Sequence, residues 1–424
     1  MVTRKYLDAC AADPALRTVM ASAELPEPLA AAWGKHLLPR PMFCDEAEIR
    51  GAADDLSALF RLLTSLPDRL FGGDVRAFCA ALGMDERRID IMTRFSGEPI
   101  LYGRADLYHD GSGYRLMEFN VGSELGGVDI SEVNRPLLAT PPFRAFAEDH
   151  GLTHVGTPAA IARQFVRATG KDAPVVATLE GVGGIAAYET LHRSFQDAMR
   201  RHGIDLVYGE VDQVQTRNGR LYLHGKPIDL VLRYYSSNQI ARDDRNERPA
   251  ETVQRAHEDG RVVLWTPVSN GMFGYKSCLA MLSECDLPPG DRALVDRVLP
   301  WTRRLTPELA DRVRAERETT ILKPIAGLSG HGVRAGWDQD DREWADTVTE
   351  CLREPYIAQR RIVPNREPVL DPATGESTDW SAVWGVFAFP DGYGGAFCRA
   401  VPDGGDSVVN FGATGARVTP VLHH

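Results

Sequence analysis

The chain has 424 residues, of which 43% are hydrophobic and 25% charged, and its formal net charge is −11. This length suffices for roughly two to four domains, and the acidic balance, with no basic run, argues against nucleic acid or an anionic membrane surface as a partner. The longest apolar stretches fall well short of the ~20 residues that a membrane-spanning helix needs, so we expect no membrane span.

The cysteines and the N-terminal residues indicate the compartment. The seven cysteines are odd in number, widely scattered and never in C-x-x-C spacing, which predicts neither a disulfide framework nor a zinc site. The first thirty residues carry acidic side chains instead of a basic start and an apolar middle, so no secretory signal is expected. We therefore expect a cytoplasmic protein. His423 and His424 are interpreted as possible remnants of an expression tag.

The first two expected domains are a helical region and a hairpin. Over 1–95 apolar residues recur at spacings of three and four, which is typical of helices. Over 96–150 the alternating segment Ile100–Val121 turns at Asp110–Gly113, which predicts a β-hairpin.

The third expected domain, 151–265, contains a β-α-β unit. The apolar run Val175–Leu179, the helical segment Ala186–Arg201 and the apolar run Asp205–Val211 follow one another. A second hairpin is expected at Asn218–Gly219, and a further strand at Asp229–Tyr235.

The fourth expected domain, 266–424, begins at a segment marked by proline and glycine. Its mixture of helices and strands is typical of an α+β domain. The expected elements are helix Lys276–Ser283, strand Thr319–Pro324, helix Asp341–Leu352, and strands Tyr356–Ile362, Ser381–Phe389 and Gly395–Val401. Together the four parts predict a mixed α+β and α/β fold.

A pattern R-x-D-x11-E-x-N lies on the predicted hairpin. If the turn takes five residues, Arg104 lies opposite Glu118 and Asp106 opposite Leu116. Because side chains alternate with period two, Asn120 then shares one face with Arg104, Asp106 and Glu118. The opposite, apolar face would consist of Ala105, Leu107, Met117, Phe119 and Val121.

These polar residues suit magnesium and phosphate. Asp106, Glu118 and Asn120 offer two carboxylates and a carboxamide, the hard oxygen ligands that Mg²⁺ accepts. Arg104 beside them can hold a phosphoryl group in transfer. The simpler interpretation is a solvated sheet face on which Arg104 pairs with Glu118. Further motifs downstream favour the first interpretation.

Three downstream motifs suit a nucleotide. Lys323 ends an apolar strand and precedes a glycine loop whose N–H groups can cover phosphates, in the reverse order of a Walker A motif. Lys276 opens a helix after Gly271 and Gly274. The strand end 355–359 could meet an adenine edge. The loop and strand-end candidates are Gly327, Ser329, Gly330, His331, Gly332, Val333, Ile357 and Gln359.

Together these motifs resemble the ATP-grasp ligases. The R-x-D and E-x-N elements precede both lysines, so the order looks circularly permuted, as in the synthetase domain of the glutathionylspermidine synthetase family. The resemblance covers roughly residues 95–400. It implies a permuted ATP-grasp fold that uses ATP and Mg²⁺ and joins a small-molecule carboxylate to an amine through an acyl phosphate, releasing ADP and phosphate. A homodimer is a possible assembly.

The resemblance also implies roles for single residues. Asp106, Glu118 and Asn120 would bind magnesium, and Arg104 would be the catalytic residue that stabilises the phosphoryl group. ATP would be contacted by Lys276, Lys323, Gly327, Ser329, Gly330, His331, Gly332, Val333, Ile357 and Gln359. Candidates for binding a substrate are Ser123, Arg233 and Arg399, although each could equally be an ordinary polar residue of a strand or turn.

Two other functions compete. The segment Gly181–Ala186 satisfies G-x-G-x-x-A between a strand and a helix, with Glu210 at the end of the next strand. This pattern is typical of dinucleotide-binding folds and would suit an NAD(P)- or FAD-dependent oxidoreductase. The second competitor is a catalytically inactive nucleotide-binding scaffold.

Overall fold

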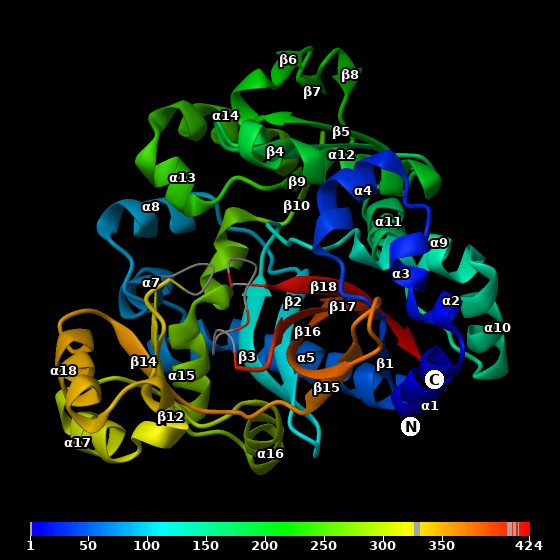
Figure 1. Ribbon diagram of the computed structural model, residues 1–424. Coiled ribbons are helices and arrows are strands. Elements are labelled where there is room, and N and C mark those ends of the chain that lie inside the picture. The colour runs from blue at the N-terminus through cyan, green and yellow to red at the C-terminus, as the bar shows by residue number, and fades with distance from the viewer. Residues whose placement is uncertain (1, 326–330, 405–408, 410–412, 414) are drawn as a thin grey trace.

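The computed structural model describes residues 2–325, 331–404, 409, 413 and 415–424. A seven-stranded sheet lies at the centre of the molecule (Figure 1) and consists of β1 (Met42–Cys44), β2 (Gly103–His109), β3 (Tyr114–Val121), β15 (Arg366–Leu370), β16 (Ser377–Phe389), β17 (Gly392–Pro402) and β18 (Arg417–His423). Its order is β1-β18-β17-β16-β2-β3, with β15 paired to β16. All pairs are antiparallel except β1 with β18.

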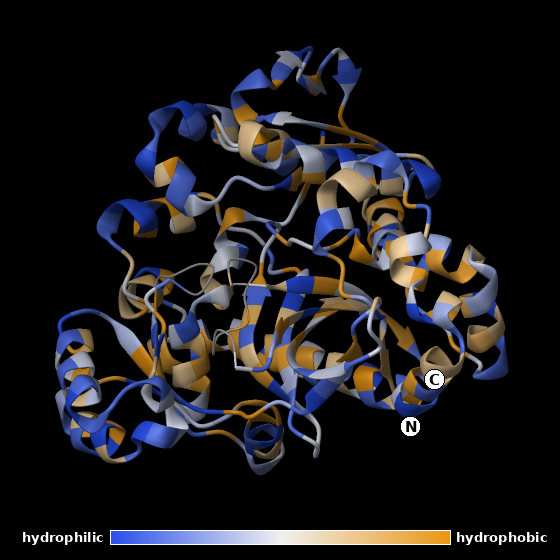
Figure 2. Cartoon of the chain, viewed as in Figure 1, coloured by the Kyte–Doolittle hydropathy of each residue, from blue (hydrophilic) through white to orange (hydrophobic). Residues whose placement is uncertain are grey.

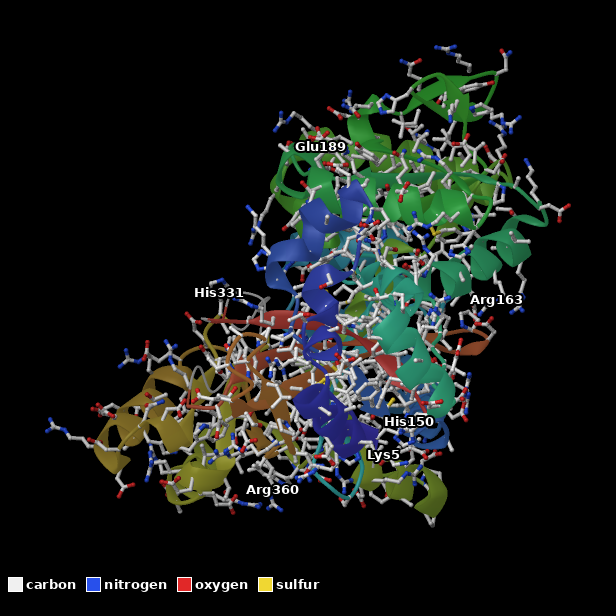
Figure 3. All side chains as sticks on the ribbon, turned by 45° about the vertical axis from the view of Figure 1, so that its right-hand side comes forward. Lys5, His150, Arg163, Glu189, His331 and Arg360 are labelled. Atoms are coloured by element: carbon white, nitrogen blue, oxygen red, sulfur yellow. The ribbon has the colours of Figure 1, made fainter. Side chains whose placement is uncertain are left out.

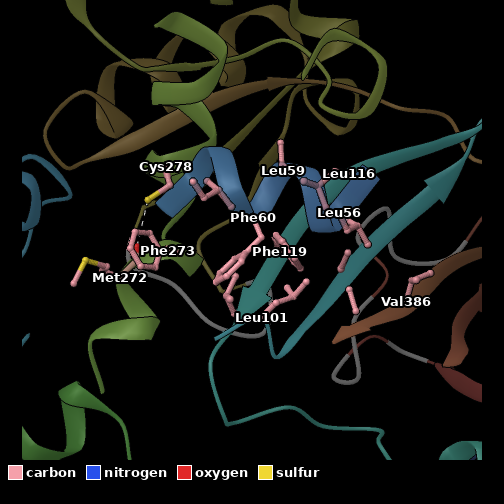
Figure 4. Packing of buried hydrophobic residues seen from close by; sticks show 14 of the residues in the cluster. Leu56, Leu59, Phe60, Leu101, Leu116, Phe119, Met272, Phe273, Cys278 and Val386 are labelled. Atoms are coloured by element: carbon pink, nitrogen blue, oxygen red, sulfur yellow. Dashed lines mark hydrogen bonds between the residues drawn. The ribbon is translucent and has the colours of Figure 1, made fainter. Parts of the chain in front are cut away.

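One face of this sheet is covered by helix α5 (Glu46–Thr64). The side chain of Asp45 accepts a hydrogen bond from the Glu48 N–H and so caps the helix. Apolar residues three and four positions apart then face the sheet. Figure 4 shows Leu56, Leu59 and Phe60 of α5 on the side where Leu116 and Phe119 of β3 lie. Each such buried side chain contributes roughly 1.5–3 kcal/mol, which fixes this face as the core.

The hairpin forms as expected, but its predicted register is wrong. The observed pairs are Arg104 with Asn120, Ala105 with Phe119, Asp106 with Glu118, Leu107 with Leu116 and Tyr108 with Arg115. The register shifts between Asp106 and Leu107, so Met117 is an extra residue on β3, as in a β-bulge. Met117 packs against the cluster around Tyr108, and Leu116 joins the core face in its place.

A four-stranded parallel sheet lies at the top of Figure 1 and contains β4 (Val175–Glu180), β5 (Asp205–Glu210), β9 (Leu230–Arg233) and β10 (Val263–Trp265), in the order β10-β9-β4-β5. Helix α12 (Ile185–Arg201) connects β4 to β5. The predicted β-α-β unit is therefore present. The expected second hairpin turns at Asn218–Gly219, where both residues have positive φ, and belongs to a small sheet of β6 (Gln215–Arg217), β7 (Arg220–Leu223) and β8 (Lys226–Pro227).

A second four-stranded sheet lies at the lower left of Figure 1 and contains β11 (Thr302–Arg304), β12 (Thr320–Pro324), β13 (Arg334–Ala335) and β14 (Tyr356–Arg360), in the order β11-β14-β12-β13. One face, with Leu322 and Ala358, packs on α17 (Pro307–Ala315) and α18 (Asp341–Cys351). The other face, with Ile357, meets Ala280 of α15 (Lys276–Glu284).

The remaining helices surround these sheets, and polar residues concentrate on their outer surfaces in Figure 2. They are α1 (Val2–Ala12), α2 (Pro14–Arg17), α3 (Val19–Ser22), α4 (Glu27–Trp33), α6 (Leu66–Phe71), α7 (Val75–Ala81), α8 (Glu86–Arg94), α9 (Asn134–Ala139), α10 (Pro141–Asp149), α11 (Thr157–Thr169), α13 (Ser237–Arg242), α14 (Asp244–Glu258) and α16 (Pro289–Val298). Among the helices of the described residues, none has the length and apolar character needed to cross a bilayer.

Two sequence interpretations change at the ends of the chain. The region 1–95 is helical apart from β1, a three-residue strand too short to show alternation, which pairs with β18. His423 is not a detached tag residue, because it is the last residue of β18 and only 1% exposed. Its Nε2 lies 2.8 Å from the Tyr393 hydroxyl, and burial lowers the pKa of His423 to about 4.

Candidate active site

Asp106 lies on the polar face of the seven-stranded sheet between two arginines. Arg104, two residues earlier on β2, places Nε 2.9 Å from Asp106 Oδ1. Arg399 of β17 reaches across β16 and places Nη2 2.5 Å from Asp106 Oδ2. All three side chains are buried. Burial alone would raise the pKa of Asp106, but the two guanidinium groups outweigh it and lower this pKa to about 2. The carboxylate therefore stays anionic at neutral pH.

A glycine in β16 makes room for this arrangement. Gly385 pairs with Asp106 on one side and Phe397 on the other. A Cβ on Gly385 would come 2.8 Å from the Phe397 ring, so a side chain there would displace the ring. The guanidinium carbons of Arg104 and Arg399 each lie 5.9 Å from the centroid of that ring. Phe397 thus supports both arginines through cation–π attraction.

Glu118, opposite Asp106 on β3, forms an ion pair with Lys276. Lys276 Nζ lies 2.8 Å from Glu118 Oε1. Helix α15 begins at Lys276, just after the 3₁₀ helix η4 (Val268–Gly274). A Cβ on Gly274 would lie 3.4 Å from the Val121 backbone nitrogen, so this segment runs close against β3. The Glu118 side chain is 30% exposed, which leaves it the more open of the two carboxylates.

Lys323, on β12, connects the β11-β14-β12-β13 sheet to the hairpin of β2 and β3. Its Nζ donates to Gln359 Oε1 at 2.7 Å and to the Met117 carbonyl oxygen at 3.1 Å. Burial is the main cause that lowers the pKa of Lys323, to about 8. The charge of Glu118 opposes this shift, and that of Lys276 adds to it.

Among the described residues of this cluster, cations outnumber anions. The cations are Arg104, Lys276, Lys323 and Arg399, and the anions are Asp106 and Glu118. The described part of the chain thus places four cations beside two carboxylates. All but Glu118 are more than nine-tenths buried. Buried charge is costly unless an ion of opposite sign compensates it, so the arrangement fits an anionic ligand such as a polyphosphate.

The donor set also fits a magnesium ion. Asp106 and Glu118 are directly opposed across the strands, and Asn120 shares their face. The Asn120 amide nitrogen donates to the Arg104 carbonyl oxygen at 3.4 Å, which leaves the carboxamide oxygen as a ligand. All three supply oxygen, as Mg²⁺ prefers. Within the described residues no group of three or more His, Cys, Asp or Glu side chains is arranged to hold a metal, so a metal here would depend on Asn120, water or a ligand.

Comparison with known proteins identifies the fold. No protein-family model and no curated protein sequence matches the chain. Among solved structures, the chain is similar to a glutathione synthetase-like effector from Globodera pallida, solved in its apo form, with a TM-score of 0.59 and 12% sequence identity over 97% of this chain and 98% of that one. The chain has a glutathione synthetase-like fold. At this identity the likeness concerns the fold alone, and it does not single out glutathionylspermidine synthetase.

Two of the predicted substrate residues, Arg233 and Ser123, make hydrogen bonds inside the protein. Arg233, at the end of β9, is 1% exposed and donates to the backbone oxygens of Thr266 and Tyr235, while its Nη1 lies 3.3 Å from Glu124. Ser123 is fully buried and shares hydrogen bonds with Thr266. Both therefore hold the loop after β3 against the parallel sheet, and their substrate roles stay predictions.

The predicted phosphate loop is described only in part. Gly327, Ser329 and Gly330 lie outside the described residues. His331 is exposed and lies at the molecular surface (Figure 3). Gly332 accepts a hydrogen bond from the Tyr356 hydroxyl at 3.2 Å, and Val333 is half-buried. Ile357 is buried between the β11-β14-β12-β13 sheet and α15, on a strand that is paired on both sides.

The competing glycine turn is surrounded by carboxylates. The backbone N–H of Ile185, at the start of α12, points to Glu210 Oε1 at 3.4 Å. A Cβ on Gly184 would lie 3.1 Å from Glu180 Oε2. The helix N-terminus, where a pyrophosphate would bind in a dinucleotide fold, thus has two acidic side chains beside it.

Sequence reasoning missed several members of the cluster. Arg399 was predicted only as a substrate candidate, and Phe397 and Gly385 were not predicted. They approach Asp106 because β16 pairs with β2, a strand that is distant in the sequence. The one available signal was the charged residue on an otherwise apolar strand, since Arg399 is the one charged side chain in the sequence of β17 and is nevertheless buried.

Proposed function

We propose that this protein is an ATP- and magnesium-dependent ligase that joins a carboxylate to an amine through an acyl phosphate and releases ADP and phosphate. The observation that carries the proposal is the gathering of Arg104, Lys276, Lys323 and Arg399 around Asp106 and Glu118 within the described residues. Such a group of cations and carboxylates suits a nucleotide polyphosphate with its magnesium. The glutathione synthetase-like fold supports the same class of reaction.

Each charged residue then has a defined task. Lys276 and Lys323 would bind the ATP phosphates, and Arg104, already fixed by Asp106 and Phe397, would stabilise the phosphoryl group during transfer to the substrate carboxylate. Asp106, Glu118 and Asn120 would hold magnesium, which when bound supplies Lewis-acid charge to the phosphate oxygens. Because Glu118 is paired with Lys276 in this structure, magnesium and Lys276 would share or exchange this carboxylate.

The site joins two sequence segments that the permuted ATP-grasp order separates. Lys276 and Lys323, from 266–424, contact Glu118 and the Met117 carbonyl oxygen, from 96–150. We propose that these segments together form the ATP-grasp unit, with 151–265 on the substrate side and 1–95 as a helical cover. The resemblance to the glutathionylspermidine synthetase family supports this order of motifs.

The test is to incubate the protein with Mg²⁺-ATP and pools of carboxylates and amines, and to separate the nucleotides by chromatography. We expect ADP and phosphate to appear only when both an acid and an amine are present. AMP and pyrophosphate would indicate an adenylate-forming enzyme and contradict the proposal. Tight ATP binding with no turnover in any pool would indicate the inactive scaffold instead, and binding of NAD or FAD in preference to ATP would support the oxidoreductase.

A further inference from the structure

Three polar side chains lie together on the face of the β11-β14-β12-β13 sheet that meets α15. Gln359 of β14 pairs with Thr302 of β11 and with Ile321 of β12. Lys323 is two residues beyond Ile321, so its side chain shares a face with Gln359 and lies diagonally beside it. Lys323 is 7% exposed, and Thr302 and Gln359 are fully buried. Their hydrogen bonds must therefore be satisfied within the protein or by a ligand.

The donors and acceptors of the hydrogen bonds among these three side chains can be assigned in only one way. Thr302 Oγ1 lies 2.8 Å from the Pro300 carbonyl oxygen, which can only accept, so the hydroxyl proton is used there. The hydroxyl oxygen then accepts from Gln359 Nε2 at 3.0 Å. This turns Gln359 Oε1 toward Lys323 Nζ, 2.7 Å away. An ammonium group has no lone pair, so only this orientation of the Gln359 amide satisfies both neighbours.

The same contacts fix the ammonium group. Lys323 Nζ has three N–H donors, and the described residues take two of them, through Gln359 Oε1 and the Met117 carbonyl oxygen. The charged groups facing it are Glu118 and Asp106, which favour the ammonium form, and Lys276, which opposes it. A neutral acceptor at 2.7 Å therefore helps to keep the buried charge in place.

We propose that Pro300, Thr302 and Gln359 form a relay that orients the Lys323 ammonium group and leaves its third N–H for a phosphate of the nucleotide. Gln359 is then a positioning residue, and its carboxamide is committed to Lys323 and Thr302 instead of to an adenine edge. This inference rests on the proposed function only for the identity of the ligand. The hydrogen-bond relay itself is independent of it.

The first test measures Mg²⁺-ATP and Mg²⁺-GTP affinity by calorimetry. Gln359→Met keeps the side-chain length but removes both hydrogen bonds, and we expect the Kd for both nucleotides to rise about tenfold, the effect of losing roughly one charged hydrogen bond. Thr302→Val should give a smaller rise, because the amide loses its orienting partner, and Thr302→Ser should restore wild-type affinity. A selective loss of ATP over GTP would show an adenine contact and overturn the proposal.

The second test needs no nucleotide and separates this inference from the proposed function. Acetylation of Lys323 by acetic anhydride at neutral pH, followed by mass spectrometry, reports the fraction of free amine. We expect faster labelling in Gln359→Met and Thr302→Val and unchanged labelling in Thr302→Ser. Equal labelling of Lys323 in all four proteins, with native circular dichroism, would overturn the relay even if ATP turnover is found. Wild-type protein that shows the labelling pattern but binds no ATP would instead contradict the proposed function.

Discussion

The two strand ends that the sequence offers as nucleotide sites differ in the sign of the charge around them. β12 ends near Lys323, with Lys276 and Arg104 nearby in the same cluster. β4 ends at Glu180, and the side chain of Glu210, the last residue of β5, lies beside the start of α12. Both strands precede a glycine-containing segment, and both are buried. The first lies in the cluster of cations, whereas two carboxylates lie beside the second.

This difference shows what a glycine pattern leaves open. Glycines allow a backbone to approach a phosphate, but the electrostatic field that attracts the phosphate comes from side chains elsewhere in the fold. At β12 these side chains come from β2, β17 and α15. At β4, Glu210 instead accepts from the Ile185 N–H at the helix N-terminus, and Glu180 Oε1 forms a hydrogen bond with His192 Nε2 at 3.0 Å.

The largest effect should come from the same substitution made at each strand end. Glu118→Gln removes a proposed magnesium ligand and the partner of Lys276, so we expect the rate of the proposed ligase reaction to fall about 100-fold and the magnesium requirement to rise. Glu210→Gln keeps an oxygen for the Ile185 N–H and should leave the rate unchanged. Steady-state rates over a magnesium titration decide this. A larger loss of rate in Glu210→Gln than in Glu118→Gln would place the nucleotide site at the end of β4 instead of β12.

A second substitution tests the cation at β12. Lys323→Ala should raise the Kd for Mg²⁺-ATP about 30-fold, because a charge-assisted hydrogen bond to phosphate contributes about 2 kcal/mol. The matched control is Lys226→Ala, which removes a lysine whose Nζ lies 2.7 Å from Asp205 at the exposed start of β5. Calorimetry should show wild-type affinity for this control. Wild-type affinity in Lys323→Ala as well would mean that the cluster is purely structural.

The buried pair of arginines should also affect stability in a pH-dependent way. Arg399→Gln leaves Asp106 with one guanidinium group, and we expect the free energy of unfolding at pH 7 to fall by about 2 kcal/mol. The pKa of Asp106 is about 2 in the folded protein and ~3.9 in an unfolded chain, so its contribution is present above pH 4 and lost as the pH falls toward 2.

Urea unfolding at pH 7 and pH 3 measures this effect. The difference between wild type and Arg399→Gln should shrink at pH 3, because the wild-type advantage depends on an ionised Asp106. Arg87→Gln is a suitable control, since Arg87 pairs with Glu247 at the surface and its side chain is 43% exposed. Its effect should be within ~1 kcal/mol. A difference for Arg399→Gln that is the same at both pH values would rule out this ion pair as its cause.

The sequence predicts local pieces of the site well and their assembly poorly. The hairpin alternation correctly places Arg104, Asp106, Glu118 and Asn120 on one face, because period-two alternation survives a change of register. The register itself depends on the bulge at Met117, and no residue of the turn indicates this bulge in the sequence. The β-α-β unit is likewise found from its apolar runs and its helical spacing.

Contacts between distant strands are what the sequence leaves undetermined. Asp106 and Arg399 meet only because β16 lies between β2 and β17 and contributes a glycine at the crossing. The pairing of β1 with β18 also joins residues almost 400 positions apart, and three residues carry too little pattern to reveal it. Propensity and periodicity are local, so strand order and the charge partners that it creates follow from packing of the whole chain.

The smallest effect should come from the glycine turn itself. Gly183 has a φ of +82°, and a Cβ there would meet no atom within 4 Å, so Gly183→Ala introduces only left-handed backbone strain. We expect the free energy of unfolding to fall by about 1 kcal/mol. Gly203→Ala provides the control, because Gly203 has a φ of +77° with the same open space and lies outside both strand ends.

In both variants the Kd for Mg²⁺-ATP should stay at the wild-type value, since neither glycine lies in the charged cluster. A dinucleotide site would behave differently, because a methyl group on the second glycine of the fingerprint would obstruct the pyrophosphate while leaving Gly203→Ala unaffected. Equal losses of stability in the two variants, with unchanged ATP affinity, would therefore assign Gly183 a purely conformational role. A specific loss of nucleotide binding in Gly183→Ala would move the nucleotide site from β12 to β4, whatever the charges around that turn.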